Sequence, residues 1–325
     1  MGNLPLFDDR WILAQRRGVP RMDGAALPSP EPVRPYAYLV EPEFTAEGRV
    51  EDVATIFITN KECPFRCLMC DLWRNTTLAR VQSGSVFAQV EWALRQLPPA
   101  DHLKLYNSGN FFDDQAISRG DRDRLVTLVA EHRTVIVECH PKLVDARCIE
   151  FARSINPVLQ VAMGLETVDP AVLPRLNKRM TLDDFARATE RLVSRDIAVR
   201  AFILLRTPFQ SEPEGVEWAR RSIDFAFSIG VECCAVVPTR TGNGAMERLM
   251  EQGQFHPPTL RSMEAVLEYG LSLGQGRVLM DLWDIEKFHT CPTCSPRRAE
   301  RLARMNLSQQ VPAPTACDCP LEIVD

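Results

Sequence analysis

The sequence has no apolar stretch long enough to cross a bilayer, no internal repeat and no low-complexity tract. Because a spanning helix needs about 20 consecutive apolar residues, we expect no membrane association. Residues 1–5 open no apolar segment of the kind that begins a secretory signal, and Leu6 stands where a myristoylation signal requires Ser or Thr. Positive charge is not in excess either. The net charge of −5 argues against a general polyanion binder but leaves a local basic patch open.

The chain does have the length and composition of an ordinary globular protein. Its 325 residues are 45% hydrophobic and 25% charged, enough for one large α/β domain with appendages. It contains eleven cysteines. Without a secretory signal these cysteines predict a cytoplasmic protein that uses thiolates to bind metal instead of forming disulfides.

Three of the cysteines, Cys63, Cys67 and Cys70, have the spacing C-x3-C-x2-C directly after a run rich in β-branched residues, 53–59. A [4Fe–4S] cluster has four irons, each of which takes one terminal ligand. Three close thiolates therefore leave one iron open to bind a small molecule and pass it an electron. A structural zinc site usually has four ligands in two separated pairs, which this triplet lacks. Three cysteines that merely pack together remain the alternative.

From residue 49 onward, short β-branched or apolar runs alternate with stretches of helical periodicity. We expect strands at 53–60, 102–108, 134–139, 158–164, 198–205 and 232–238, and helices near 83–97, 120–131, 145–154, 181–194 and 213–229. This alternation predicts an α/β fold with a parallel sheet and right-handed crossovers. An open doubly wound sheet and an incomplete barrel both fit the count.

Residues 1–48 are expected to form an N-terminal arm. It would contain a short helix at 11–15, a stiff proline-rich linker at 28–35 and an edge strand at 36–40.

Polar or small residues follow every expected strand, at the sheet edge where parallel α/β proteins carry their chemistry. Glu138, Cys139 and His140 end the third strand and are candidates for substrate contact or for proton and hydrogen transfer. The alternatives are a hydrogen-bonded structural histidine and a plain buried thiol. Cys148 is also interpreted as a buried thiol.

The triplet, its place after the first strand and the β/α pattern together resemble the radical S-adenosylmethionine (SAM) superfamily. The resemblance implies a partial (β/α)6 barrel over 49–245, preceded by the arm and followed by a cysteine-containing extension over 246–325. It implies that the open iron chelates the amino and carboxylate groups of SAM. Reduction of the cluster would then split the sulfonium and yield a 5′-deoxyadenosyl radical.

The resemblance also implies which residues contact SAM. The loop of Ser108, Gly109 and Asn110 would accept hydrogen bonds from the SAM ammonium, with Gly109 allowing close backbone approach. The two other polar positions are Glu166, for the ribose or methionyl part, and Arg206, for the carboxylate; Met69 would pack on adenine. The alternatives are an ordinary turn for the loop and a solvent-facing side chain for Glu166. For Arg206 the alternative is a surface salt bridge, and for Met69 it is simple loop packing.

A second group of cysteines lies near the C-terminus. Cys291 and Cys294 form a C-x2-C pair, and Cys317 and Cys319 form a C-x-C pair after 22 intervening residues. Two pairs of soft ligands predict a four-thiolate site for Zn²⁺ or for a second [4Fe–4S] cluster, with His289 able to replace one thiolate. Four unligated thiols in a charged tail are the alternative. Between the pairs, residues 297–304 form a basic helix, interpreted as a solvated face or a phosphate contact.

Several core segments narrow the resemblance to the radical SAM subunit of archaeosine synthase, within the elongator and methylthiotransferase-like group. They are 106–113, 137–141, 164–167 with 176–178, and 203–209. This resemblance implies radical C–N lysis of a lysine adduct on a tRNA base, with a flavodoxin or ferredoxin as electron donor. Two other hypotheses stay open: a radical SAM tailoring enzyme for a small molecule or peptide, and a non-catalytic iron–sulfur or zinc protein.

Overall fold

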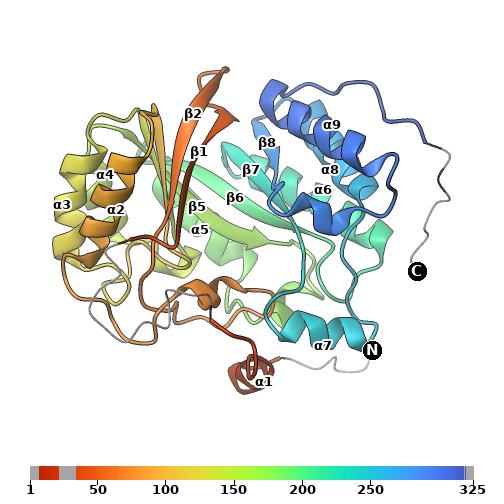
Figure 1. Ribbon diagram of the computed structural model, residues 1–325, viewed down its shortest axis with the longest axis horizontal. Coiled ribbons are helices and arrows are strands. Elements are labelled where there is room, and N and C mark those ends of the chain that lie inside the picture. Colours follow the sequence, from red (N-terminus) through yellow and green to blue (C-terminus); the bar gives the residue numbers. More distant parts are fainter. Residues whose placement is uncertain (1–6, 22–33, 318, 320–325) are drawn as a thin grey trace.

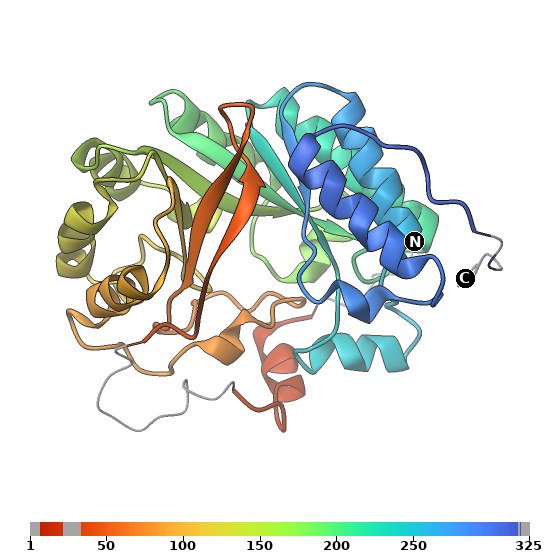
Figure 2. The same cartoon turned by 45° about the horizontal axis from the view of Figure 1, so that its top comes forward.

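A computed structural model describes residues 7–21, 34–317 and 319. In this part of the chain, eight strands form one sheet in sequence order, which curves into a half-barrel (Figures 1 and 2). The antiparallel pair β1 and β2 begins the sheet, and every later pairing is parallel. The strands are β1 (Ala37–Phe44), β2 (Val50–Phe57), β3 (His102–Tyr106), β4 (Thr134–Glu138), β5 (Val158–Glu166), β6 (Ala198–Leu205), β7 (Cys233–Pro238) and β8 (Arg277–Met280).

The α/β prediction is confirmed, because the crossover helices return the chain between parallel strands as expected. They are α2 (Ser85–Gln96), α3 (Arg119–Val129), α4 (Ala146–Ser154), α5 (Leu182–Val193) and α6 (Glu212–Ser228). Thr181 forms the expected capping box with Asp184, which fixes the start of α5. The main hydrophobic core lies between these helices and the convex face of the sheet. No helix among the described residues is long and apolar enough to cross a membrane.

Strand β8 is a correction to the six strands expected, since four residues carry too little alternation to be recognised. It extends the sheet beyond β7 and is followed by α9 (Ser295–Ser308). The outer edge of β8 is paired with side-chain amides of the α9 segment. Gln309 exchanges two hydrogen bonds with the backbone of Val278 (3.0 and 2.9 Å), and Asn306 does the same with Met280 (2.8 Å each).

The gap between the edge strands is bridged by a buried ionic network. Glu43 of β1 accepts from Arg200 of β6 (2.6 Å), from Lys104 of β3 (2.7 Å) and from Arg277 of β8 (3.4 Å). All four side chains are about nine-tenths buried or more. Arg200 and Lys104 outweigh the desolvation of the carboxylate and hold the pKa of Glu43 well below its usual value. The network thus joins strands that share no backbone hydrogen bonds.

The carboxyl end of the sheet is covered by two helices that lie far apart in sequence. Helix α1 (Asp9–Gln15) contacts α7 (Ala245–Glu251), and both lie along the lower edge of Figure 1. A second, smaller hydrophobic core joins them to Leu68 of the cysteine loop. The helix expected at 11–15 is therefore confirmed, and so is the edge strand near 36–40. The expected proline-rich linker lies mostly outside the described residues.

The ionic network makes a stability prediction. Glu43→Gln leaves three buried cations short of one negative charge, so we expect it to lower the free energy of unfolding by about 3 kcal/mol. Glu217→Gln is the matched control. It removes an exposed pair with Arg221 and should change the free energy by less than about 0.5 kcal/mol. Urea unfolding at pH 7, followed by circular dichroism, measures both. Equal effects of the two substitutions would contradict the structural role of Glu43.

Candidate functional site

The cysteine triplet lies on the loop that follows β2, at the carboxyl end of the half-barrel. Remote side chains fix the backbone of this loop. Asn243 donates to the carbonyl oxygens of Leu68 (2.8 Å) and Cys70 (3.2 Å), and Asn177 donates to that of Arg66 (2.7 Å). In addition, the Leu68 side chain is fully buried. The loop is therefore positioned by contacts from the opposite side of the fold.

The three thiols are partly accessible, and their sulfurs do not all lie within 4.8 Å of one another. Among the described residues, ligand atoms of three or more His, Cys, Asp or Glu residues come within 4.8 Å of one another at two places, and the triplet is neither. Burial raises the pKa of the Cys63 thiol to about 11 and those of Cys67 and Cys70 to about 12. Metal binding therefore has to displace three protons.

The donor set fits a [4Fe–4S] cluster bound through three irons. Three thiolates on separate irons require wide sulfur spacing and room for inorganic sulfide between them. Asn110 donates its side-chain amide to Cys63 Sγ (3.3 Å), a contact of the kind that tunes cluster potential. Gly109 lies against the same cysteine, where an added Cβ would come within 3.2 Å of Cys63 Cβ. The predicted loop of Ser108, Gly109 and Asn110 thus adjoins the triplet.

Glu166 and Lys178 form a buried ion pair beside Cys67. Glu166 ends β5 in the left-handed backbone region, at a register shift of the strand pair β5 and β6. Lys178 brings a positive charge to thiolates that would otherwise repel one another; its pKa is raised because the attraction of Glu166, Cys67 and Cys63 outweighs desolvation. Gly164 provides the space for the pair, since an added Cβ would lie 2.1 Å from Glu166 Oε1 and 2.3 Å from Lys178 Nζ.

Glu138 ends β4 and accepts backbone hydrogen bonds from the β3 loop. Its Oε2 atom accepts from the amides of Asn107 (2.8 Å) and Ser108 (3.0 Å). Burial raises the pKa of Glu138 to about 7, more than these hydrogen bonds lower it. A carboxyl group with a pKa near neutrality can both donate and accept a proton, so the structure keeps Glu138 suitable for the predicted transfer role.

His140 occupies a fixed, uncharged position. Its ring stacks on Phe65 with centroids 3.7 Å apart. Nδ1 accepts from the Lys142 amide (3.2 Å), so Nε2 carries the proton and donates to the Lys178 carbonyl oxygen (3.0 Å). Burial and the charge of Lys178 lower the pKa of His140 to about 3. The structure therefore favours the structural interpretation of His140 over the catalytic one, because both ring nitrogens are engaged.

Cys139 is not brought to the site. It is buried in the main hydrophobic core and interacts with Cys148 of α4, as the plain-thiol interpretation expects. Arg206 is also engaged elsewhere, since it donates to Glu212 and to the carbonyl oxygen of Pro257 (2.9 Å). Met69 packs on the smaller core beside the loop. The SAM contacts expected of Arg206 and Met69 stay predictions.

Sequence reasoning did not assign a role to several residues that shape the site. Asn177 and Lys178 appeared only as part of a resembling segment, and Asn243, Phe65 and Tyr36 gave no signal at all. Tyr36 contacts Ser108 through their hydroxyl groups (3.2 Å). Each of these residues acts on the site across a long sequence separation, which a local pattern does not reveal.

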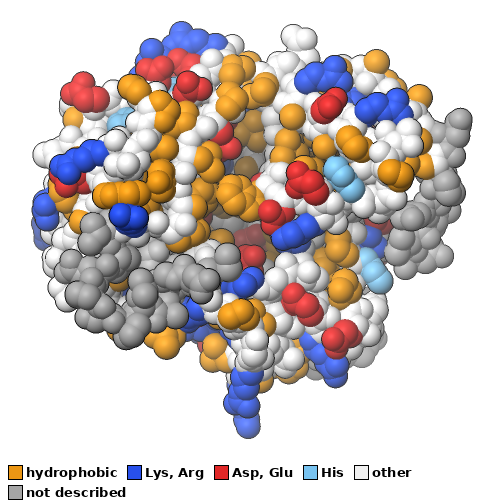
Figure 3. Space-filling model, in the orientation of Figure 1, with side chains coloured by type: hydrophobic (Ala, Val, Ile, Leu, Met, Phe, Trp, Pro, Cys, Tyr) orange, Lys and Arg blue, Asp and Glu red, His pale blue; other side chains and the backbone are white. Residues whose placement is uncertain are grey.

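The space beneath the loop is the concave side of the half-barrel. Figure 3 shows it as a hollow between the β1–β2 ribbon and the C-terminal elements. Aromatic rings gather there at centroid separations of 5.6–6.2 Å, and each ring is at least partly exposed. They belong to Tyr36, Phe57, Tyr106, Phe202 and Trp283. Such a surface offers flat faces on which a planar group can stack.

Gly164→Ala tests the Glu166–Lys178 pair. The added methyl group collides with both charged ends, so we expect the variant to retain its fold but to bind less than half of the wild-type iron after anaerobic reconstitution. Gly120→Ala is the control, because its Cβ would meet nothing closer than 3.8 Å. Iron analysis and visible absorption measure the outcome. Wild-type iron content in Gly164→Ala would show that the pair is not needed.

Glu138 makes a pH prediction. Because its folded-state pKa is raised, the folded protein keeps a proton that the unfolded chain loses above about pH 4.3. Stability should therefore fall as pH rises from about 5 to about 7, by on the order of 2–3 kcal/mol from this group. Glu138→Gln should flatten that dependence, whereas Glu150→Gln, at an exposed position, should not. Urea midpoints across this pH range measure the difference, and parallel curves for wild type and Glu138→Gln would contradict it.

Comparisons with known proteins find two relatives with a similar sequence and a solved structure with a similar fold. No protein-family profile matches the chain. Archaeosine synthase subunit beta of Methanosarcina acetivorans is 28% identical over 269 residues, covering 78% of this chain and 77% of that protein. Archaeosine synthase subunit beta of Thermococcus kodakarensis is 28% identical over 217 residues, covering 62% and 65%.

Among solved structures, the archaeal Methanocaldococcus infernus Elp3 lacking its N-terminal residues 1–46 has a similar fold. Its TM-score is 0.52 at 13% identity, and the match covers 70% of this chain and 62% of that one. The chain thus shares the half-barrel fold of that structure and is similar in sequence to archaeosine synthase subunit beta over most of its length.

Proposed function

We propose that this chain cleaves SAM reductively at a [4Fe–4S] cluster held by Cys63, Cys67 and Cys70, and uses the resulting radical on a modified tRNA base. The observation that carries the proposal is a C-x3-C-x2-C thiol triplet on an anchored loop at the carboxyl end of a half-barrel. When bound, the cluster supplies one electron to SAM, which becomes a source of the 5′-deoxyadenosyl radical.

The residues around the triplet have separate roles in positioning the cysteine thiolates and SAM. Asn110 orients Cys63, and Lys178 offsets thiolate charge while it is itself held by Glu166. We assign the SAM ammonium to the loop of Ser108 and Gly109, which lies directly beside Cys63. Arg206 would have to leave Glu212 to reach the SAM carboxylate, so its contribution depends on that exchange.

For the substrate we propose a base flipped into the half-barrel, where radical C–N lysis takes place. The aromatic rings of the concave face support a planar substrate, because proteins hold unstacked bases between aromatic side chains. The exposed Trp283, half of whose surface is accessible, is the ring best placed to meet an incoming base. Glu138 provides a carboxyl group that can exchange a proton near neutral pH.

The proposal extends to partners. The relatives are named as beta subunits, which supports a second subunit that shares the work on tRNA. The net charge of −5 fits this division, since a partner would then supply most of the phosphate contacts. We further propose a flavodoxin or ferredoxin as the electron donor.

Reconstitution of the cluster tests the first step. Under anaerobic conditions with iron, sulfide and dithionite, the protein should convert SAM into 5′-deoxyadenosine, measured by liquid chromatography. Cys67→Ala removes one iron ligand and should reduce the rate at least about 100-fold, whereas Cys148→Ala, at a buried cysteine outside the triplet, should retain it. Iron-loaded protein that leaves SAM intact under reductant would refute the function.

The substrate is tested separately with the same assay. Transfer RNA that carries a lysine adduct on a 7-deazaguanine base should stimulate the formation of 5′-deoxyadenosine, and unmodified tRNA should not. Stimulation by a small molecule or a peptide alone would assign the enzyme to a tailoring reaction instead.

A further inference from the structure

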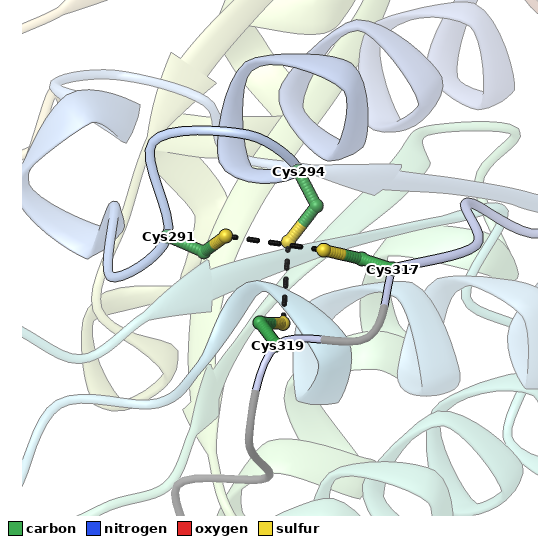
Figure 4. Close-up of side chains that lie close together, drawn as sticks. All are labelled: Cys291, Cys294, Cys317 and Cys319. Atoms are coloured by element: carbon green, nitrogen blue, oxygen red, sulfur yellow. Dashed lines mark hydrogen bonds between the residues drawn. The ribbon is translucent and has the colours of Figure 1, made fainter.

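The two C-terminal cysteine pairs converge although 22 residues separate them in sequence (Figure 4). Cys291 and Cys294 flank the start of α9, and Cys317 and Cys319 lie on the segment that returns along this helix. All four Sγ atoms lie within 4.8 Å of one another. The separation is 4.0 Å between Cys291 and Cys317 and 3.7 Å between Cys294 and Cys319. These distances are too long for disulfides, so the four sulfurs surround a common point.

The spacing of the four sulfurs indicates which kind of metal centre they can bind. Zinc–sulfur bonds of about 2.3 Å place the thiolates of a tetrahedral site about 3.8 Å apart, which is the spacing observed. A [4Fe–4S] cluster attaches each thiolate to a different iron, so its thiolate sulfurs are held farther apart by the whole cluster. We propose that the four C-terminal cysteines bind one tetrahedral Zn²⁺ ion and not a second iron–sulfur cluster.

Arginines of α9 position the segment that leads to the second cysteine pair. Arg301 donates to the carbonyl oxygens of Ala313 (2.9 Å) and Pro312 (2.6 Å), Arg298 donates to that of Thr315 (3.2 Å), and Arg297 to that of Ala316 (3.3 Å). These contacts lay the segment before Cys317 along the helix in an extended form.

Helix α8 (Leu260–Ser272) holds the arginines from the other side. Arg298 and Arg301 are both less than one-tenth exposed and pair with Glu264, and Arg301 also pairs with Glu268 (2.6 Å). The expectation that residues 297–304 form a solvated or phosphate-binding face is therefore wrong for these two arginines. Their side chains are engaged in placing two of the four proposed zinc ligands.

The surroundings also match the charge of the proposed centre. Zn²⁺ with four thiolates carries a net charge of −2, which needs nearby donors and cations. Arg261 Nη2 donates to Cys319 Sγ (3.3 Å), and Cys294 caps α9, at the positive end of the helix dipole. Ser295 organises the first pair, because its hydroxyl accepts from the Cys291 amide (3.1 Å) while its own amide donates to the Cys291 carbonyl oxygen (3.0 Å).

A metal at this place would link two parts of the fold. The first cysteine pair ends the connection from β8, in which the Trp283 ring lies 5.9 Å from that of Phe57 in β2, and the second pair ends the segment that lies on α9. The ion is therefore a structural metal that links the connection after β8 to the segment that follows α9. It takes no part in electron transfer, because Zn²⁺ has no redox chemistry.

Metal analysis of variants tests the inference independently of SAM cleavage. As-purified wild-type protein should contain about one zinc per chain, and the triple variant Cys63→Ala/Cys67→Ala/Cys70→Ala should retain it. Cys291→Ser/Cys294→Ser should lose the zinc yet still bind about four irons on reconstitution, like the control Cys148→Ala. About eight irons in wild type, with four of them lost in Cys291→Ser/Cys294→Ser, would overturn the proposal.

Cobalt substitution on the wild-type chain tests the geometry without relying on the stability of a variant. After zinc is removed with a chelator, added Co²⁺ should produce the intense visible bands of a tetrahedral thiolate site, and one equivalent of Zn²⁺ should abolish them. Weak bands of octahedral cobalt, no bands, or a single iron in place of zinc in the purified protein would each refute the zinc assignment.

Discussion

The reactive end of this protein depends on hydrogen bonds between the cysteine loop and segments more than 100 residues away. The loop has no regular structure that would hold three thiols at fixed separations. Instead, Asn177 and Asn243, which lie on two other connections of the half-barrel, hold the loop by donating hydrogen bonds to its backbone carbonyl oxygens. Lys178 is also positioned by a distant residue. His140 accepts a hydrogen bond from the Lys142 amide and donates one to the Lys178 carbonyl oxygen, which holds the Lys178 backbone in place. The site is thus a product of the whole sheet, which brings these connections to one edge.

Buried charge organises the rest of the molecule. Glu43 holds three cations from three strands, and Glu264 holds two arginines of α9. In both places one buried carboxylate pairs with two arginines from other elements of the fold. Such pairs add less net stability than an apolar core of the same size would, but they specify which elements meet. Here they specify how the two ends of an unclosed barrel come together.

Local pattern was sufficient to predict the frame. The strands other than β8, the crossover helices, the capping box at Thr181 and both cysteine groups have signals contained within a few residues. The parts that could not be predicted depend on distant partners. Arginines spaced along α9 read as a solvated face because the sequence does not show that α8 supplies acids to them. Cys139 ends a strand as a catalytic residue would, yet its side chain faces the helices, and only the structure decides between the two faces.

The amides that line the outer edge of β8 have a consequence for how the molecule behaves among its copies. A half-barrel has two free edges, and an exposed edge is a template on which strands of other chains can add. Asn306 and Gln309 present to β8 the donors and acceptors that a ninth strand would offer, but from a helix that cannot propagate the ladder. The half-barrel can therefore stay open without adding strands of other chains along that edge.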